Sequence, residues 1–155
     1  MTTHPDIAPP LADRRFCANG GDLLDRTYRA DILNYFAAHP EIAPYVGGPI
    51  DFTNAMYDAN VYLFGEHGGL LFNWCAPRIY EVHIMLTRAG RGAWGIAATK
   101  EALAKLGADM VWARIEPGNR PLSQHAVRCG FRRVELKTLY ALGQSKPYYI
   151  YEWRA

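Results

Sequence analysis

The sequence is short of the residues that many catalytic and metal-binding motifs require. Its three cysteines lie far apart and form no Cys-x-x-Cys pair, so neither a disulfide framework nor a zinc site is indicated. Its five histidines show no His-x-x-x-His spacing, and neither serine lies in a Gly-x-Ser-x-Gly sequence. No Gly-Lys-Ser or Gly-Lys-Thr of a Walker A loop occurs. We therefore expect no metal centre, no serine hydrolase and no P-loop nucleotide site.

Charge of one sign and long apolar runs are also scarce. The formal net charge is +2 with both signs interspersed, which is too weak to predict binding to nucleic acid or to an anionic membrane. No apolar run reaches the about 18 residues of a membrane-spanning helix. The first residues lack a basic stretch followed by an apolar core, so we expect no secretory signal. Together with the unpaired cysteines, this favours a cytoplasmic protein.

What is present is enough apolar material for one core. The chain has 155 residues, of which 50% are hydrophobic and 13% aromatic. This length corresponds to one domain that folds without disulfides or metals. Three prolines among residues 1–12 predict a loose tail, followed by a single domain over residues 13–155.

A strand and two helices are predicted first. Arg14–Ala18 has strand character, and Leu23–Ala38 has a helical stripe made of Leu24, Tyr28, Ile32, Tyr35 and Phe36. The residue before a proline avoids helical dihedral angles, so His39-Pro40 should end this helix. After a loop over residues 40–50, Asp51–Tyr57 is predicted as a short helix with Asp51 as its N-cap.

An antiparallel meander is predicted next. Its three short strands are Asn60–Gly65, Leu70–Ala76 and Ile79–Leu86, joined by tight turns at residues 66–69 and 77–78. The remaining elements are a helix over Ile96–Leu106, a strand over Asp109–Glu116, a helix over Pro121–Cys129 and strands over Phe131–Tyr140 and Pro147–Trp153. The order β-α-α-β-β-β-α-β-α-β-β predicts an α+β fold.

The stretch with chemical content joins the third meander strand to the helix after it. Ile79–Leu86 runs into Gly90-Arg91-Gly92-Ala93-Trp94-Gly95. The first N–H groups of a helix are unsatisfied and carry partial positive charge, and glycines let the backbone approach an anion. This pattern predicts a phosphate cradle with Arg88 and Arg91 as counter-charges. The alternative is an ordinary strand–helix connection with solvated arginines.

Residues 90–95 also match the Gly-x-Gly-x-x-Gly of dinucleotide-binding folds. Two observations weigh against that interpretation. The preceding strand belongs to an antiparallel meander, and only one β-α-β unit follows the motif. Asp109 also comes before the next strand, whereas the acidic residue that binds the ribose should stand at its end.

Three motifs together resemble the GCN5-related N-acetyltransferase (GNAT) superfamily. They are Tyr-Glu-Val-His-Ile-Met-Leu (80–86) with the Gly-Arg-Gly loop and helix after it, Asn-Arg-Pro-Leu-Ser (119–123) directly after a strand, and Cys-Gly-Phe-Arg (129–132) closing the next helix. The Asn-Arg-Pro-x-Ser variant is similar to the ribosomal-protein N-acetyltransferase branch. The combination of Tyr-Glu-Val-His (80–83) with Gly-Arg-Gly (90–92) also resembles small acetyltransferase-like proteins carried by phages.

The resemblance implies a mixed, mostly antiparallel central sheet with helices on both faces. It implies an enzyme that moves an acetyl group from acetyl-CoA to a primary amine of a small molecule or protein. A backbone N–H near Leu86 would hold the thioester carbonyl. The residues that it implies for CoA binding are Met85, Leu86, Arg88, Arg91, Gly92, Ala93, Trp94, Gly95, Asn119 and Ser123.

The sequence departs from the family pattern at three positions. With Gly92 as the central glycine of the family loop, Ala89 and Trp94 stand at its first and last positions, and Gly95 would compensate. Ala126 stands where many relatives carry the tyrosine that protonates the leaving thiolate. Ser123 would replace that acid by bonding the CoA sulfur.

Glu81 and His83 are the expected catalytic pair, with Ser123 as the third catalytic residue. Glu81 and His83 share one face of their strand, opposite Val82, Ile84 and Leu86. We expect this face to point toward the first two helices and Glu81 to have a raised pKa, suited to accept the amine proton, with His83 as a relay. The alternatives are that both lie at an exposed strand start or that His83 is a bonded core histidine.

Simpler interpretations of the other residues stay open. Asn119 is either a ligand of the pantetheine arm or a turn residue after Pro-Gly, and Ser123 is either a ligand or a hydroxyl in a first helical turn. Cys129 lies on an apolar stripe and is expected in the core. Two rival functions remain: a non-catalytic acyl-CoA-binding module and a nicotinamide-dinucleotide binder. The aromatic run Tyr148–Trp153, taken as an exposed edge, predicts a homodimer.

Overall fold

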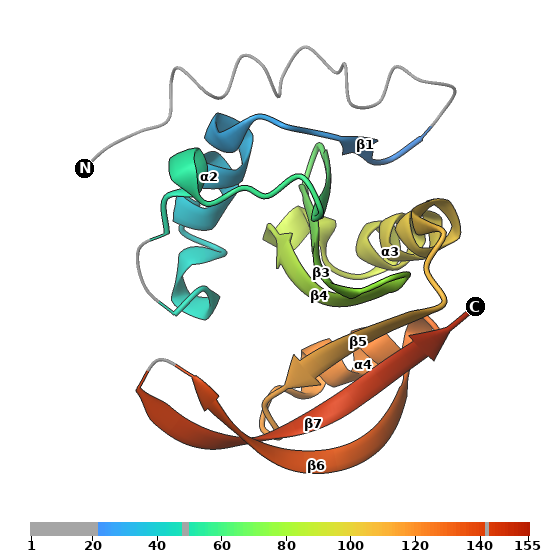
Figure 1. Ribbon diagram of the computed structural model, residues 1–155. Helices are drawn as coiled ribbons and strands as arrows, with labels where there is room; N and C mark the ends of the chain where they lie inside the picture. Colours follow the sequence, from blue (N-terminus) through green and yellow to red (C-terminus); the bar gives the residue numbers. More distant parts are fainter. Residues whose placement is uncertain (1–21, 48–49, 142) are drawn as a thin grey trace.

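The computed structural model of the chain describes residues 22–47, 50–141 and 143–155 (Figure 1). The tail predicted for residues 1–12 and the strand predicted for Arg14–Ala18 lie outside the described residues. No described helix is long and apolar enough to cross a membrane.

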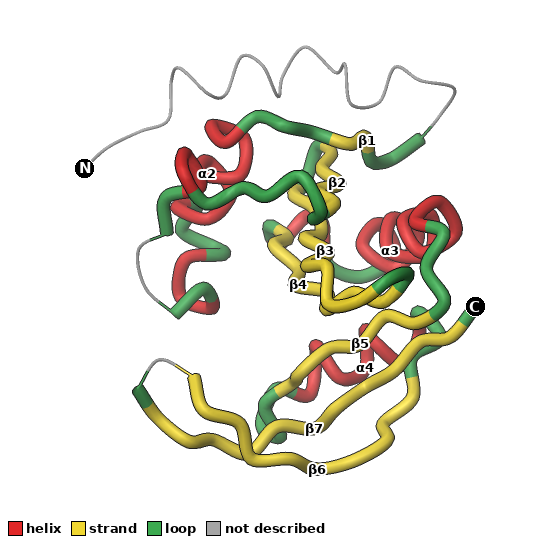
Figure 2. The backbone as a smooth tube through the Cα atoms, viewed as in Figure 1, coloured by secondary structure: helices red, strands yellow, loops and turns green. Residues whose placement is uncertain are grey.

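Within these residues, seven strands form one sheet in the order β1-β2-β3-β4-β5-β7-β6 (Figure 2). Neighbouring strands are antiparallel except β4 and β5, which are parallel. The predicted α+β fold with a mixed, mostly antiparallel sheet is therefore confirmed. The strands are β1 Asp25–Arg26, β2 Val61–Gly65, β3 Gly68–Ala76, β4 Ile79–Leu86, β5 Met110–Ile115, β6 Arg132–Ala141 and β7 Gln144–Arg154.

Helices cover both faces of this sheet, as expected. On one face, α3 (Ala93–Leu106) and α4 (Arg120–Arg128) contribute to a core with Phe72 and Val111. On the other face, α2 (Ala30–Ala38) packs against Phe64 and Met85. Figure 1 shows α2 and α3 on opposite sides of β3 and β4. Single 3-10 turns, η2 (Ala43–Tyr45), η3 (Phe52–Asn54) and η4 (Arg88–Gly90), stand in the loops.

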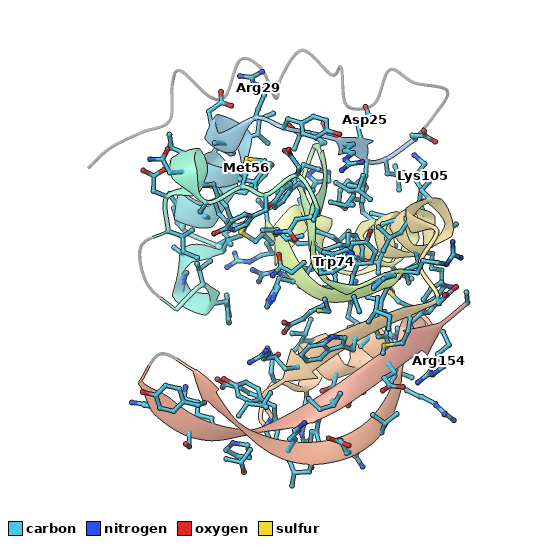
Figure 3. The ribbon with its side chains drawn as sticks, viewed as in Figure 1. Asp25, Arg29, Met56, Trp74, Lys105 and Arg154 are labelled. Carbon is cyan, nitrogen blue, oxygen red and sulfur yellow. The ribbon has the colours of Figure 1, made fainter. Side chains whose placement is uncertain are left out.

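The helix predicted over Leu23–Ala38 was wrong in its first seven residues. The backbone N–H groups of Leu23 and Leu24 donate to the Glu101 carboxylate at 3.0–3.1 Å. Asp25 and Arg26 then pair with β2 as β1. Figure 3 shows Lys105 on α3 near this segment, where its ammonium lies 2.7 Å from the Asp22 carboxylate. These tertiary bonds override the helical periodicity.

Tyr28, predicted in the apolar stripe, is consequently 67% exposed, and α2 begins only at Ala30. The second predicted helix is a single 3-10 turn. Asp51 caps it as expected by accepting from the Thr53 N–H at 2.9 Å. The helix does not continue to Tyr57 because the Tyr57 N–H donates to the Tyr62 hydroxyl at 3.2 Å.

Candidate active site

The sheet opens between its two parallel strands. β4 and β5 pair only at their starts, through Ile79–Met110, Tyr80–Val111 and Glu81–Trp112. Beyond Glu81, β4 continues to Leu86 on β3, while β5 continues to Ile115 on β7. In the described part of the chain, the β5 side of residues 82–86 therefore has no strand partner. Unpaired main-chain groups on such an edge can pair with an extended ligand that carries amides.

The N-terminus of α3 lies directly after the end of this open edge. Gly92 is its N-cap, with a φ of 88°, and no described side chain caps the helix. The first bond of the helix runs from the Ile96 N–H to the Gly92 carbonyl at 3.0 Å. The N–H groups of Ala93, Trp94 and Gly95 precede it, so they have no carbonyl partner within the helix. A Cβ added at Gly92 would meet no heavy atom within 4 Å, so the space before the helix is open.

Two further glycines hold this turn against the end of β4. A Cβ on Gly90 would lie 2.8 Å from the His67 Cβ, and one on Gly95 would lie 2.4 Å from the Gly90 carbonyl oxygen. Both positions therefore require glycine because of close packing. Trp94 is half-buried and packs edge-on against His67, with their ring centroids 5.0 Å apart. The start of α3 is thus uncapped and approached by glycine backbone, an arrangement that can bind a phosphate.

Arg91 has a bracing role beside this cradle. Its guanidinium donates to the Leu86 carbonyl at 3.3 Å and to the Glu41 carbonyl, and lies over the Tyr45 ring. The Arg88 side chain is exposed, and its backbone N–H donates to the Glu41 carboxylate at 2.7 Å. That bond, aided by nearby positive charge, holds the pKa of Glu41 below its ordinary value. Arg91 therefore holds the loop in place, and binding a phosphate would be a second role for its guanidinium.

Glu81 lies on the face of β4 that the sequence predicted, but its environment differs from the expected one. The side chain is buried, and Arg114 on β5 binds both carboxylate oxygens, at 2.7 and 3.3 Å. The His83 Nε2 lies 3.6 Å from the Glu81 Oε2. Burial acts to raise the pKa of Glu81, but the hydrogen bonds and charges of His83 and Arg114 outweigh it and lower that pKa. The predicted rise was therefore wrong.

The two faces of β4 separate as the alternation predicts. Met85, on the face of Glu81 and His83, packs in the α2 cluster, whereas Val82 and Ile84 pack in the α3–α4 cluster. The His83 side chain is 46% exposed, so it is not a core histidine. His83 thus combines contact with a buried carboxylate and access to solvent.

Arg114 was missed by the sequence analysis. Its guanidinium carbon lies 5.4 Å from the Trp112 ring centroid and 5.8 Å from that of Tyr148. These aromatic faces hold it beside Glu81. The alternation of side chains along β5 places Arg114 on the same face of the strand as Trp112. Only the parallel pairing of Trp112 with Glu81 shows that this is also the face of Glu81.

Asn119 is the N-cap of α4 and Ser123 lies in its first turn, a short loop after β5. The Asn119 Oδ1 accepts from the Leu122 N–H at 3.3 Å, so this residue caps the helix. Ser123 is half-buried and donates its N–H to the Asn119 carbonyl. Among the described residues, no hydrogen bond or ion pair joins either side chain to Glu81 or to the cradle. Because β4 and β5 are parallel, their carboxyl ends lie at the same end of the split.

A histidine that the sequence analysis did not single out joins α4 to the cradle helix. The His125 Nε2 lies 3.1 Å from the Thr99 Oγ1, and a Cβ on Gly95 would lie 3.3 Å from the His125 Cε1. Burial lowers the pKa of His125. Ala126 and Cys129 are core residues, so the position of the missing tyrosine is filled by a buried methyl group. No group of three or more potential metal ligands occurs among the described residues.

No protein-family model and no curated protein matches this sequence. Solved structures do match. A chimera of the spermidine N-acetyltransferase SpeG from Vibrio cholerae and hSSAT has a TM-score of 0.66 at 13% identity, covering 84% of this chain and 95% of that one. A protein described as a phosphinothricin N-acetyltransferase has a TM-score of 0.64 at 18% identity, covering 84% and 96%.

A Bacillus subtilis acetyltransferase in complex with CoA has a TM-score of 0.61 at 12% identity, covering 85% of this chain and 97% of that one. At these identities the likeness concerns the fold. The chain therefore has the fold of the GCN5-related N-acetyltransferase superfamily.

Proposed function

We propose that this protein is an N-acetyltransferase that moves an acetyl group from acetyl-CoA to a primary amine. The observation that carries the proposal is the separation of β4 from β5 beyond Glu81, with the uncapped start of α3 at the end of the same edge. An extended pantetheine arm offers amides that would pair with the free edge of β4. Its pyrophosphate would bind the N–H groups of Ala93, Trp94 and Gly95. The CoA complex of a protein with this fold supports the assignment.

The reaction forms a C–N bond and breaks the C–S bond of the thioester. The attacking nitrogen loses a proton, and the leaving thiolate gains one. A backbone N–H near Leu86 would stabilise the oxyanion that develops on the carbonyl. An alkyl amine is mostly protonated at neutral pH, so a base is required.

His83 is the better base of the expected pair. His83 and Arg114 lower the pKa of Glu81 and so keep it ionised, which makes Glu81 a weaker proton acceptor. The His83 side chain is 46% exposed, so an incoming amine can reach it, and an imidazole nitrogen can accept the amine proton. In this arrangement Glu81 is a positioning residue that orients His83 and stabilises its protonated ring. Ser123 is the proposed partner of the CoA sulfur, since Ala126 lacks a polar group.

The similar structures named for spermidine and phosphinothricin support an amine acceptor. The acceptor would approach on the face shared by Glu81 and His83, which α2 borders.

The decisive experiment is release of free thiol from acetyl-CoA over a panel of amines. We expect at least one alkyl amine to release free thiol from acetyl-CoA. We expect no oxidation or reduction of NAD(H) by the protein. Stoichiometric acetyl-CoA binding without amine-dependent CoA release would instead support a non-catalytic acyl-CoA-binding module. Binding of NAD(H) in preference to CoA would support the dinucleotide interpretation.

A further inference from the structure

The sheet has a long uncovered edge at β6. In the described part of the chain, β6 pairs with β7 alone, and residues 132–138 are exposed. Leu136 and Tyr140 are 61% and 75% exposed. Such an edge offers its main-chain groups to another strand. The run Tyr148–Trp153, predicted to be this edge, lies instead in β7 between β5 and β6, so that part of the prediction was wrong.

The charges of β6 are self-complementary about one residue. Glu135, Leu136 and Lys137 pair with Ile150, Tyr149 and Tyr148 of β7, so Glu135 and Lys137 share one face and Leu136 lies on the other. If two copies of β6 meet antiparallel with Leu136 opposite Leu136, each Glu135 faces a Lys137. The arrangement gives two cross-strand ion pairs on one face and an apolar pair on the other.

The registers centred on the neighbouring residues Glu135, Lys137 and Val134 lack this match. Centring the pair on Glu135 or on Lys137 places like charges opposite each other, which is destabilising. Centring it on Val134 would oppose Arg133 to Glu135. A register shift separates these two residues, however, and Arg133 lies 4.3 Å over the Tyr149 ring, on the face opposite Glu135. These two side chains therefore cannot meet.

We infer that two copies of this chain associate through antiparallel pairing of their β6 strands, centred on Leu136, to form one continuous sheet. A lysine and a bulge on an edge strand normally discourage pairing. Here they disfavour the registers centred on Val134, Glu135 and Lys137, whereas the register centred on Leu136 lets Glu135 neutralise Lys137. In the sheet order, β7 separates β6 from the split between β4 and β5, so the association is independent of the proposed acetyl-CoA site.

The test is the molar mass of the full chain by light scattering, from low to high micromolar concentration. We expect the mass of two chains for the natural sequence. Glu135→Lys and Lys137→Glu should each raise the dimer Kd about tenfold or more, because each creates two like-charge pairs. Asp58→Lys, an exposed loop substitution, is the matched control and should stay dimeric.

Rescue distinguishes the proposed register from loss of folding. The double variant E135K/K137E should regain the dimer. Mixing the two single variants should form a heterodimer, because all four charges are then complementary. A natural chain that stays monomeric at high micromolar concentration would overturn the inference. So would single variants that dimerise as tightly as the natural chain, or a mixture of them that forms no heterodimer.

Discussion

At the scale of single residues, Arg114 determines what Glu81 can do. A buried carboxylate without a partner is strongly disfavoured, whereas a bidentate guanidinium compensates the charge. The Arg114 side chain is 28% exposed and the Glu81 side chain is 11% exposed, so the ion pair is only partly accessible to water. Glu81 is therefore held ionised close to the exposed His83.

Replacement of the arginine tests this pairing. Arg114→Met should lower the free energy of unfolding by about 2–3 kcal/mol, somewhat less than for a fully buried pair because Arg114 keeps partial exposure. The measurement is urea unfolding at pH 7. E81Q/R114M should recover most of the loss, because no charge is left unpaired. A double variant as unstable as Arg114→Met would contradict the ion-pair account.

The lowered pKa of Glu81 makes its contribution to stability depend on pH. Its folded pKa lies below its unfolded value. The contribution is thus complete above the unfolded carboxyl pKa of about 4.3 and is lost as pH falls through the folded value. The stability difference between the natural chain and Glu81→Gln should shrink as pH falls through the folded pKa of Glu81. A difference that grew in acid would contradict the assigned direction.

Catalysis offers a second test at the residue scale. His83→Ala should lower kcat about 10²–10⁴-fold, the usual contribution of a general base, with little change in CoA affinity. Glu81→Gln should lower kcat less and shift the acid limb of the pH–rate profile, as a positioning residue would. His39→Ala, on α2's C-cap, is a matched histidine control. Unchanged kcat in both site variants across pH 6–9 would place the base elsewhere.

At the scale of elements, the start of α3 carries the phosphate proposal. Ala93→Asp places a carboxylate at an exposed N-terminal helical position, where it interacts favourably with the helix dipole. The free protein should be as stable as the natural chain or slightly more so. CoA should bind about tenfold more weakly or worse, because the new charge repels the pyrophosphate.

Isothermal titration with CoA and thermal unfolding of the free chain measure the two effects. Ala93→Asn is the control of similar size without charge, and it should keep most of the affinity. Equal CoA affinity in the Ala93→Asp and Ala93→Asn variants would contradict the proposal that the pyrophosphate binds at the N-terminus of α3.

Another element-scale prediction concerns the junction of α3 with the segment before β1. Glu101 accepts from two backbone N–H groups and also lies 3.4 Å from Lys105. Glu101→Ala should cost about 1–3 kcal/mol, since it leaves partly buried donors unsatisfied. Hydrogen exchange at Leu23 and Leu24 should accelerate, while exchange in β3 stays slow. Unchanged exchange at these two amides would contradict the role assigned to Glu101.

At the scale of the whole molecule, ligand binding must stabilise the native state. At about 100-fold excess over its Kd, acetyl-CoA should add about 2.7 kcal/mol to stability. For a chain of this size that corresponds to a rise in Tm of about 5–10 °C. NAD(H) at the same concentration should give no rise. A larger shift with NAD(H) than with acetyl-CoA would contradict the proposed ligand.

Much of the local structure was predictable because it depends on short-range chemistry. The bounds of β4 follow from a short apolar run between turn residues, and they agree to the residue. Gly107 ends α3 in the left-handed region, and Asn119 with a proline starts α4, as their residue types indicate. The glycine-rich turn that leads into α3 was likewise visible in the sequence.

Tertiary structure alone decided the contacts between segments far apart in the chain. Glu101 binds the N–H of Leu23, 78 residues away, and thereby prevents the helix that the local period favours. Arg114 binds Glu81 across 33 residues and, together with the neighbouring His83, lowers the pKa of Glu81 instead of letting burial raise it. A dihedral preference or an apolar period is a property of neighbouring residues, so the sequence shows it directly. A carboxylate's partner depends on which strands pair and in which register, and this emerges only when the whole sheet forms.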